Sequence, residues 1–266
     1  MVQTDLNGKC ALITEASRGI GFFAAEAFIL NGVSTLFITS RIEDRCNKSK
    51  KLLEDFARDV RKKVEIIPLF YSFLSKTESN KLVSEIILRV PKLDFLLLNA
   101  DKTFGEVFDK LPMAGPEEIK DMNVAYMLRT LETFVPLLTS EDTEADFSRV
   151  IFISSLEAMF ATDIFNMQDF AKRNIEAIDF GKKLAIQLGP KNISVSIVPP
   201  SLFLNEEYSP ILTQNLAGPN STGTVTAELD HFKNIVDWLC TKQSKYMNGL
   251  VLNNDKRKLA TTSFNL

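Results

Sequence analysis

Histidine and cysteine are scarce in this sequence. His231 is the only histidine among 266 residues. The three cysteines lie far apart and show no CxxC spacing; they are Cys10, Cys46 and Cys240. Zinc sites and disulfide frameworks require several such ligands at close spacing. We therefore predict no metal site, and we expect a reducing, cytoplasmic compartment.

Long apolar runs and domain linkers are missing as well. No stretch of about 18 apolar residues occurs, so the sequence does not predict a membrane span or an export signal. With 45% hydrophobic residues and no linker rich in proline, glycine or serine, residues 1–266 are predicted to form one domain. The net charge of −3 argues against a nucleic-acid partner.

Short apolar runs alternate with helical patterns along the whole chain. The predicted strands are 10–13, 35–39, 64–69, 95–98, 150–153, 194–198 and 250–252. The predicted helices are 22–31, 48–62, 79–89, 116–138, 170–188 and 227–240. Buried strands separated by helices predict an α/β fold, a Rossmann-type doubly wound parallel sheet of seven strands flanked by helices. The polar segment 205–226 fits either a substrate lid or a plain surface loop.

The turn between the first strand and the first helix is the most informative segment. Residues 14–21 read Thr-Glu-Ala-Ser-Arg-Gly-Ile-Gly. In such strand–turn–helix units the helix N-terminus holds a pyrophosphate, and glycines let the backbone approach it closely. Gly19 and Gly21 suit that use, whereas Glu15 stands where the first glycine is expected.

Five motifs in a fixed order carry a family resemblance. They are the loop 14–21, the segment 98–101 (Leu-Asn-Ala-Asp), Asn123, the strand end 153–155 (Ile-Ser-Ser) and the segment 249–255. With them the whole chain resembles the classical short-chain dehydrogenase/reductases, and among these the ones similar to fungal 3-oxoacyl reductases of the rhamnolipid type. The family's TGxxxGIG loop, NNAG motif, helix asparagine, catalytic serine (Ser155 here) and last-strand motif correspond to the five in turn.

The resemblance implies NADP as the cofactor, if the chain binds one. The implied binding residues are Thr14, Arg18, Gly19, Ile20, Gly21, Arg41 and Asn99. Arg18 and Arg41 resemble the pair that receives the 2′-phosphate of NADP, because an NAD enzyme usually carries an acid after the second strand. The alternative for Arg41 is a surface charge at a helix start.

Two acidic residues argue against dinucleotide binding. Glu15 puts a side chain where the loop needs a positive φ, at a cost of about 1–2 kcal/mol, and adds a carboxylate near the pyrophosphate. Asp101 replaces the glycine of the NNAG motif, which in the family lies beneath the nicotinamide half. We therefore predict impaired binding of the dinucleotide, or none.

The resemblance also exposes a missing proton donor. In the family a tyrosine protonates the carbonyl, and a lysine four residues later lowers its pKa and holds the ribose. An ungapped register places Phe170 and Asn174 at these positions, and a shifted register places Gln168 and Lys172 there. No tyrosine lies between Ser155 and Leu188 in either case. Loss of a positioned general acid typically costs about 10²- to 10⁴-fold in rate.

Three functions follow. The first is a non-catalytic family member, a pseudoenzyme, that forms a homo- or hetero-oligomer through helices 116–138 and 170–188. The second is an NADP-dependent oxidoreductase that reduces a carbonyl, 3-oxoacyl-like substrate with a substitute acid. The third is a sensor of NADP(H) or another ligand. Asn123 and Ser155 occupy family catalytic positions, but both also suit backbone capping.

Overall fold

The computed structural model describes residues 4–71, 76–99, 131–139, 147–153, 168–199 and 225–253. For residues 76, 168–177 and 225–230 it describes the backbone only. The predicted segment 205–226 lies outside the described residues apart from its last two, which open a helix.

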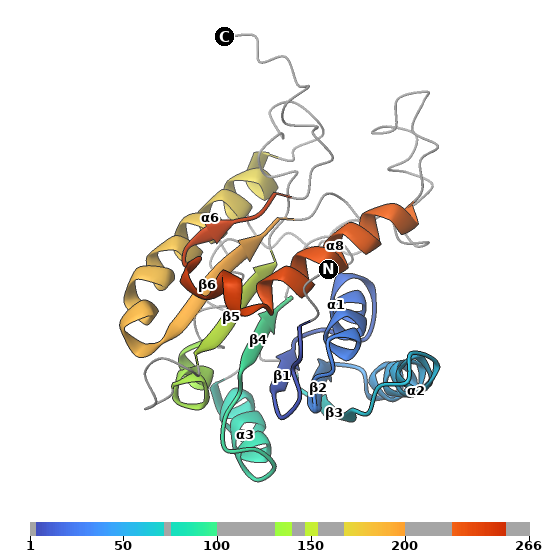
Figure 1. Ribbon diagram of the computed structural model, residues 1–266. Coiled ribbons are helices and arrows are strands. Elements are labelled where there is room, and N and C mark those ends of the chain that lie inside the picture. The colour runs from blue at the N-terminus through green and yellow to red at the C-terminus, as the bar shows by residue number, and fades with distance from the viewer. Residues whose placement is uncertain are drawn as a thin grey trace.

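One parallel sheet joins all seven described strands (Figure 1). They are β1 (Cys10–Ile13), β2 (Thr35–Ser40), β3 (Glu65–Phe70), β4 (Phe95–Leu98), β5 (Ser148–Ile153), β6 (Ile193–Val198) and β7 (Leu250–Val251). Their order is β3-β2-β1-β4-β5-β6-β7, and every neighbouring pair is parallel. The predicted Rossmann-type, doubly wound sheet is therefore confirmed.

Helices cover both faces of this sheet. They are α1 (Gly19–Leu30), α2 (Glu43–Asp59), α3 (Lys76–Ile87), α6 (Gln168–Leu188), α8 (Val225–Leu239) and a helical segment at 131–138. Five of them begin before the predicted start, at Gly19, Glu43, Lys76, Gln168 and Val225, because their first turns carry no clear apolar periodicity to mark them. The first half of the predicted helix 116–138 lies outside the described residues.

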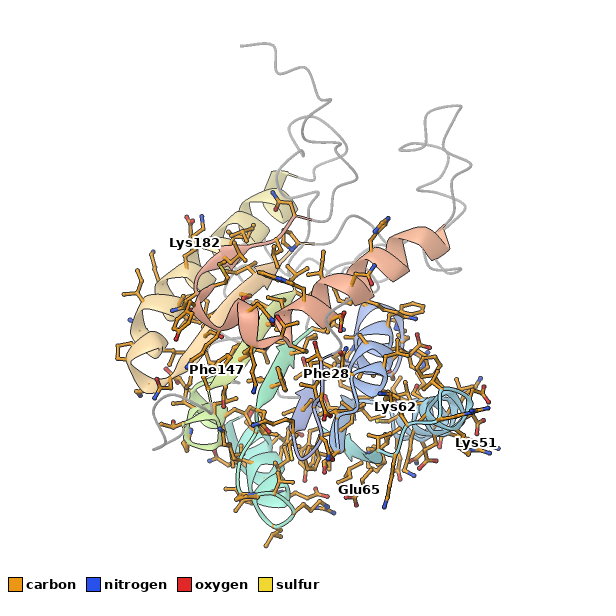
Figure 2. All side chains as sticks on the ribbon, in the orientation of Figure 1. Phe28, Lys51, Lys62, Glu65, Phe147 and Lys182 are labelled. Atoms are coloured by element: carbon orange, nitrogen blue, oxygen red, sulfur yellow. The ribbon has the colours of Figure 1, made fainter. Side chains whose placement is uncertain are left out.

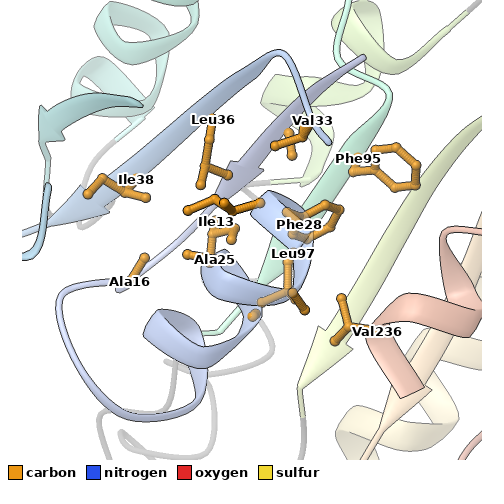
Figure 3. Close-up of a cluster of buried hydrophobic side chains, with 14 of the residues drawn as sticks. Ile13, Ala16, Ala25, Phe28, Val33, Leu36, Ile38, Phe95, Leu97 and Val236 are labelled. Carbon is orange, nitrogen blue, oxygen red and sulfur yellow. The ribbon is translucent and has the colours of Figure 1, made fainter. Parts of the chain in front are cut away.

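The core consists of two apolar clusters, one on each face. Alternate residues of a strand point to opposite faces, so Leu12 of β1 joins one cluster and Ile13 joins the other. The Ile13 cluster lies beneath α1, α2 and α8, where Phe28 packs against Phe95 with ring centroids 5.3 Å apart (Figure 3). The Leu12 cluster lies beneath α3, α6 and residues 131–138.

Asp94 ties the amino ends of the central strands together. Its buried carboxylate accepts a hydrogen bond from the backbone N–H of Cys10 at 2.8 Å and another from Lys9 Nζ at 2.9 Å. The Asp94 N–H in turn donates to the Cys10 carbonyl at 3.0 Å. This anchor lies at the edge opposite to the loop 14–21, so it supports the sheet without taking part in the site.

Charged side chains lie on the outer surface. Lys51 of α2 and Lys182 of α6 are exposed and extend away from the sheet (Figure 2). Such mixed charges solvate the outer helix faces. Among the helices within the described ranges, none combines the length and apolarity that a membrane crossing requires.

Candidate functional site

The strand order creates a switch point at the carboxyl ends of β1 and β4. The chain leaves β1 toward β2 on one side, whereas β4 continues toward β5 on the other. Open parallel sheets bind ligands in the crevice at such a point. Thr14 follows β1 and Asn99 follows β4, and the N–H of Asn99 donates to Thr14 Oγ1 at 2.9 Å. The structure thus brings together two of the predicted binding residues.

The loop after Thr14 is fixed by neighbouring strands. The N–H groups of Glu15 and Ala16 donate to Oγ1 and the carbonyl of Thr39 at 3.2 and 2.9 Å, at the end of β2. From the other side, Asn99 Nδ2 donates to the Glu15 carbonyl at 3.2 Å. The loop backbone is therefore held from β2 and β4 before any ligand binds.

Thr39 and Ser49 are functional positions that the sequence reasoning missed. The Ser49 hydroxyl, on α2, donates to the carbonyl of Ser17 at 2.8 Å. The available signal was the polar pair Thr39-Ser40 at the end of β2, because buried polar residues there need hydrogen-bond partners, which the loop supplies to Thr39. A prediction required knowing that β2 pairs with β1.

The two glycines of the loop serve different needs. Gly19 has a φ of +56°, and a Cβ there would meet no atom within 4 Å. Gly21 is buried, and a Cβ there would lie 2.7 Å from Asn99 Nδ2, 2.8 Å from the Glu15 carbonyl oxygen and 2.9 Å from Ala16 Cα. Gly19 is needed for the turn, and Gly21 for close packing of α1 against the loop.

The N-terminus of α1 suits an anion. Arg18 is its N-cap residue, no side chain caps the helix, and the first turn carries no acidic residue. The first amides of a helix have no partner within the helix, and its dipole favours negative charge there. Gly19, Ile20 and Gly21 therefore present backbone donors beside the Arg18 cation, which are the groups that a pyrophosphate requires.

Glu15 has the predicted backbone but an unexpected neighbour. Its φ of 49° confirms that the first position of the loop is left-handed. Its carboxylate Oε1 lies 3.6 Å from Arg41 Nε, so it faces the residue predicted to receive the 2′-phosphate. Arg41 precedes α2, whose N-cap is Ile42, so it lies just outside the helix. Besides the two predicted roles of Arg41, as a ligand of the 2′-phosphate or as a surface charge at a helix start, the structure shows it as the ion-pair partner of Glu15.

The charge of Glu15 also reaches behind the loop. Burial raises the pKa of the Cys46 thiol to about 11, and the nearby negative charge of Glu15 adds to the increase. Cys46 Sγ contacts the Ile38 carbonyl at 3.6 Å and is fully buried. The thiol is thus a neutral core group, not a nucleophile.

A dinucleotide fits this arrangement on its phosphate side. The loop geometry, the start of α1 and the hydrogen bond between Thr14 and Asn99 all lie at the phosphate side of the switch point. Thr14, Arg18, Ile20 and the two glycines would hold the pyrophosphate side, and Arg41 would face the adenosine side. The Glu15 carboxylate is the feature that departs from this fit.

The catalytic positions are only partly described. α6 contains both registers of the predicted pair, Phe170 with Asn174 and Gln168 with Lys172, as backbone. Residues four apart lie on one face of a helix, so the two positions of each pair share one face of α6. Three further predicted site residues lie outside the described residues: Asp101, Asn123 and Ser155.

Two of the four tyrosines lie among the described residues, and neither is in α6. The Tyr71 hydroxyl donates to Glu85 Oε2 at 3.0 Å, and burial raises its pKa. Tyr246 is 84% exposed in the turn before β7. Tyr126 and Tyr208 lie outside the described residues.

Comparisons with known proteins agree with this geometry. The family model for short chain dehydrogenases matches residues 9–212. A 3-oxoacyl-[acyl-carrier-protein] reductase FabG of Aquifex aeolicus is 24% identical over 94% of this chain and 97% of its own. The rhamnolipids biosynthesis 3-oxoacyl-[acyl-carrier-protein] reductase of Pseudomonas aeruginosa is 26% identical over 74% of each chain.

A solved structure shares the whole architecture. The complex of Pseudomonas aeruginosa RhlG with NADP superposes with a TM-score of 0.75 at 21% identity, over 95% of this chain and 97% of its own. The similarity to rhamnolipid-type reductases is thus found, but in Pseudomonas rather than in a fungus, and it is distant. From the family match, the sheet order and the loop geometry together, the chain belongs to the short-chain dehydrogenase/reductase family.

Proposed function

We propose that this chain is an NADP(H)-dependent oxidoreductase that reduces a carbonyl compound of 3-oxoacyl-like chemistry. The observation that carries the proposal is the phosphate side of the switch point, where the N–H of Asn99 donates to Thr14 Oγ1 and the start of α1 presents its first amides. Solved structures with this fold include a complex of Pseudomonas aeruginosa RhlG with NADP.

The chain's own residues would divide the work between the two sides of the site. The α1 amides and Arg18 would neutralise the pyrophosphate, and Thr14 with Asn99 would keep β1 and β4 in register beside it. Bound NADPH would supply the hydride for the carbonyl. Because no tyrosine occurs in α6, the proton would come from another group, and we expect turnover to be slower than in a tyrosine-bearing relative.

A second candidate is favoured by the same absence. Phe170, or Gln168 in the other register, has no acidic proton to give, so the chain would act without turnover. It would then be a sensor that binds NADP(H), or a non-catalytic subunit whose binding of the dinucleotide is impaired or absent. Helices 116–138 and 170–188 would then form the contact between subunits, with an active relative or a second copy. Ile186 of α6 is 77% exposed, which agrees with such a contact. A cytoplasmic location suits both candidates.

One experiment separates the two. NADPH consumption is followed with 3-oxoacyl thioesters, and NADPH binding is measured in parallel by calorimetry. Saturable binding with turnover above the protein-free rate supports the oxidoreductase, and saturable binding without turnover supports the second candidate. Absence of binding contradicts the oxidoreductase and the sensor, and together with a stable oligomer it supports the non-catalytic subunit.

A designed pair of variants tests whether the missing donor is the limiting step. The double variant Phe170→Tyr/Asn174→Lys restores the family pair in the ungapped register, and we expect its rate to rise by about 10²-fold or more. Phe180→Tyr is the matched control, because it adds a tyrosine to the same helix at a position outside both registers. An equal change in both variants would contradict the assignment.

A further inference from the structure

Glu15 and Arg41 form an ion pair across the mouth of the loop. Glu15 lies in the turn after β1, and Arg41 directly follows β2, which is the neighbouring strand. Oε1 and Nε are 3.6 Å apart, and the side chains are 28% and 35% exposed. The pair is therefore accessible to a dissolved anion and is not part of the core.

The loop backbone determines where the Glu15 carboxylate lies. Its N–H donates to Thr39 Oγ1 at 3.2 Å, and its carbonyl accepts from Asn99 Nδ2 at 3.2 Å. The residue has a φ of 49°, and its Oε1 lies 3.6 Å from Nε of Arg41, which follows β2. A glycine at position 15 would have no carboxylate to place beside the guanidinium of Arg41. The ion pair therefore exists because glutamate replaces the expected glycine.

We propose that Glu15 is a specificity-determining residue that competes with the 2′-phosphate of the dinucleotide for Arg41. This inference rests on the proposed binding of NADP(H). A guanidinium binds a phosphate and a carboxylate through the same N–H donors, so the two anions exclude each other unless Glu15 moves. The incoming 2′-phosphate also meets a like charge. A dinucleotide without that phosphate meets neither obstacle.

The consequence is a reduced preference for the phosphorylated cofactor. Removing the Glu15 charge is expected to strengthen binding of a 2′-phosphorylated ligand about three- to tenfold, since half-exposed ion pairs contribute modestly. Binding of the same ligand without the 2′-phosphate is expected to stay within twofold. The ratio of the two affinities is therefore the informative quantity.

A purely structural pair predicts something else. If the ion pair only braced the loop against β2, Glu15→Gln would change stability and would shift both affinities by the same factor. The ratio would stay constant. Removal of Arg41 gives a second criterion, because the proposed competition requires that residue. In an Arg41→Met background, Glu15→Gln is expected to change the ratio of the two affinities much less.

The test compares adenosine 2′,5′-bisphosphate with 5′-AMP by calorimetry, so that it depends on no turnover. The proteins are the parent chain, Glu15→Gln, Arg41→Met, the double variant and the control Glu85→Gln. Glu85 pairs with Arg89 at 3.3 Å with similar exposure, on α3, so its substitution removes the same charge away from the loop. The expected result is an increased preference for the bisphosphate in Glu15→Gln alone.

Three outcomes overturn the inference, and they differ in meaning. If both ligands bind but their affinity ratio is the same in Glu15→Gln and the parent, Glu15 does not determine specificity, while the proposed NADP(H) binding stands. If neither these ligands nor NADPH bind to any variant, the proposed function fails and this inference fails with it. A ratio that changes equally in Glu85→Gln would reduce the effect to net charge and would also refute the proposal.

Discussion

Replacing Gly21 by alanine is a direct test of how the loop and α1 fit together. The added Cβ would lie 2.7, 2.8 and 2.9 Å from Asn99 Nδ2, the Glu15 carbonyl oxygen and Ala16 Cα. Two of these atoms are backbone, and Asn99 is held by its bond to the Glu15 carbonyl. The start of α1 must therefore move away from the loop.

The expected cost follows from two opposing effects. Overpacking of this kind costs about 1–3 kcal/mol. Alanine recovers roughly 1 kcal/mol or less through its higher helix propensity. A net loss of about 1–2 kcal/mol lowers the melting temperature by roughly 2–8 °C in a chain of this size. Because the displaced amides are the proposed pyrophosphate donors, NADPH affinity should fall together with stability.

Gly181→Ala is the matched control. Gly181 lies in α6, and a Cβ there would come within 2.6 Å of Ile197 Cγ1 in the core. We expect a comparable loss of stability in thermal unfolding and no change in NADPH affinity. If Gly21→Ala leaves both the melting temperature and the affinity unchanged, or if the two variants weaken NADPH binding equally, the proposed role of the loop is refuted.

Three further predictions concern stability. Glu15→Gly removes a side chain from a residue in the left-handed conformation, with φ 49°. It should raise the free energy of unfolding by roughly 1 kcal/mol, because the partly exposed ion pair with Arg41 contributes less than the backbone strain costs. A lower stability in urea unfolding would contradict this. Burial raises the pKa of the Cys46 thiol from 9.0 to about 11 in the folded state. The neutral thiol therefore makes its full contribution to stability below pH 9, and this contribution is lost as the pH rises through 11. Between pH 9 and pH 11 the free energy of unfolding should therefore fall by about 2–3 kcal/mol less in Cys46→Ala than in the parent. Parallel curves of unfolding free energy against pH would refute the shift in pKa. Asp94→Ala leaves the buried Cys10 N–H without its acceptor and should lower the free energy of unfolding by about 1–3 kcal/mol. NADPH affinity should stay the same, and a change in it would contradict the placement of Asp94 outside the site.

Local patterns in the sequence predict much of this fold. Buried parallel strands consist of apolar residues on both faces, so β1 and β4 could be predicted to the residue from four apolar side chains each. Helix starts were less predictable. α2 opens with Glu43 and Asp44, which suit the positive end of the helix dipole but carry no apolar repeat, so the pattern begins only further along.

The site divides in the same way. Gly19, Gly21 and the left-handed conformation at Glu15 follow from the chemistry of one turn, which is contiguous in the sequence. The contact of Glu15 with Arg41 depends on the register between β1 and β2, and the turn's support by Thr39 depends on the same pairing. The sequence alone therefore predicts a carboxylate near the pyrophosphate. It does not predict the contact of that carboxylate with Arg41.

Hydrogen–deuterium exchange with and without NADPH would show whether the dinucleotide binds at the switch point. We expect NADPH to slow exchange at the amides of residues 18–21, at the start of α1, and in the segments around Arg41 and Asn99 that surround the switch point. The amino edge around Asp94 should remain unchanged. Unaltered exchange at residues 18–21 under saturating NADPH, or protection confined to another part of the chain, would contradict dinucleotide binding at this site.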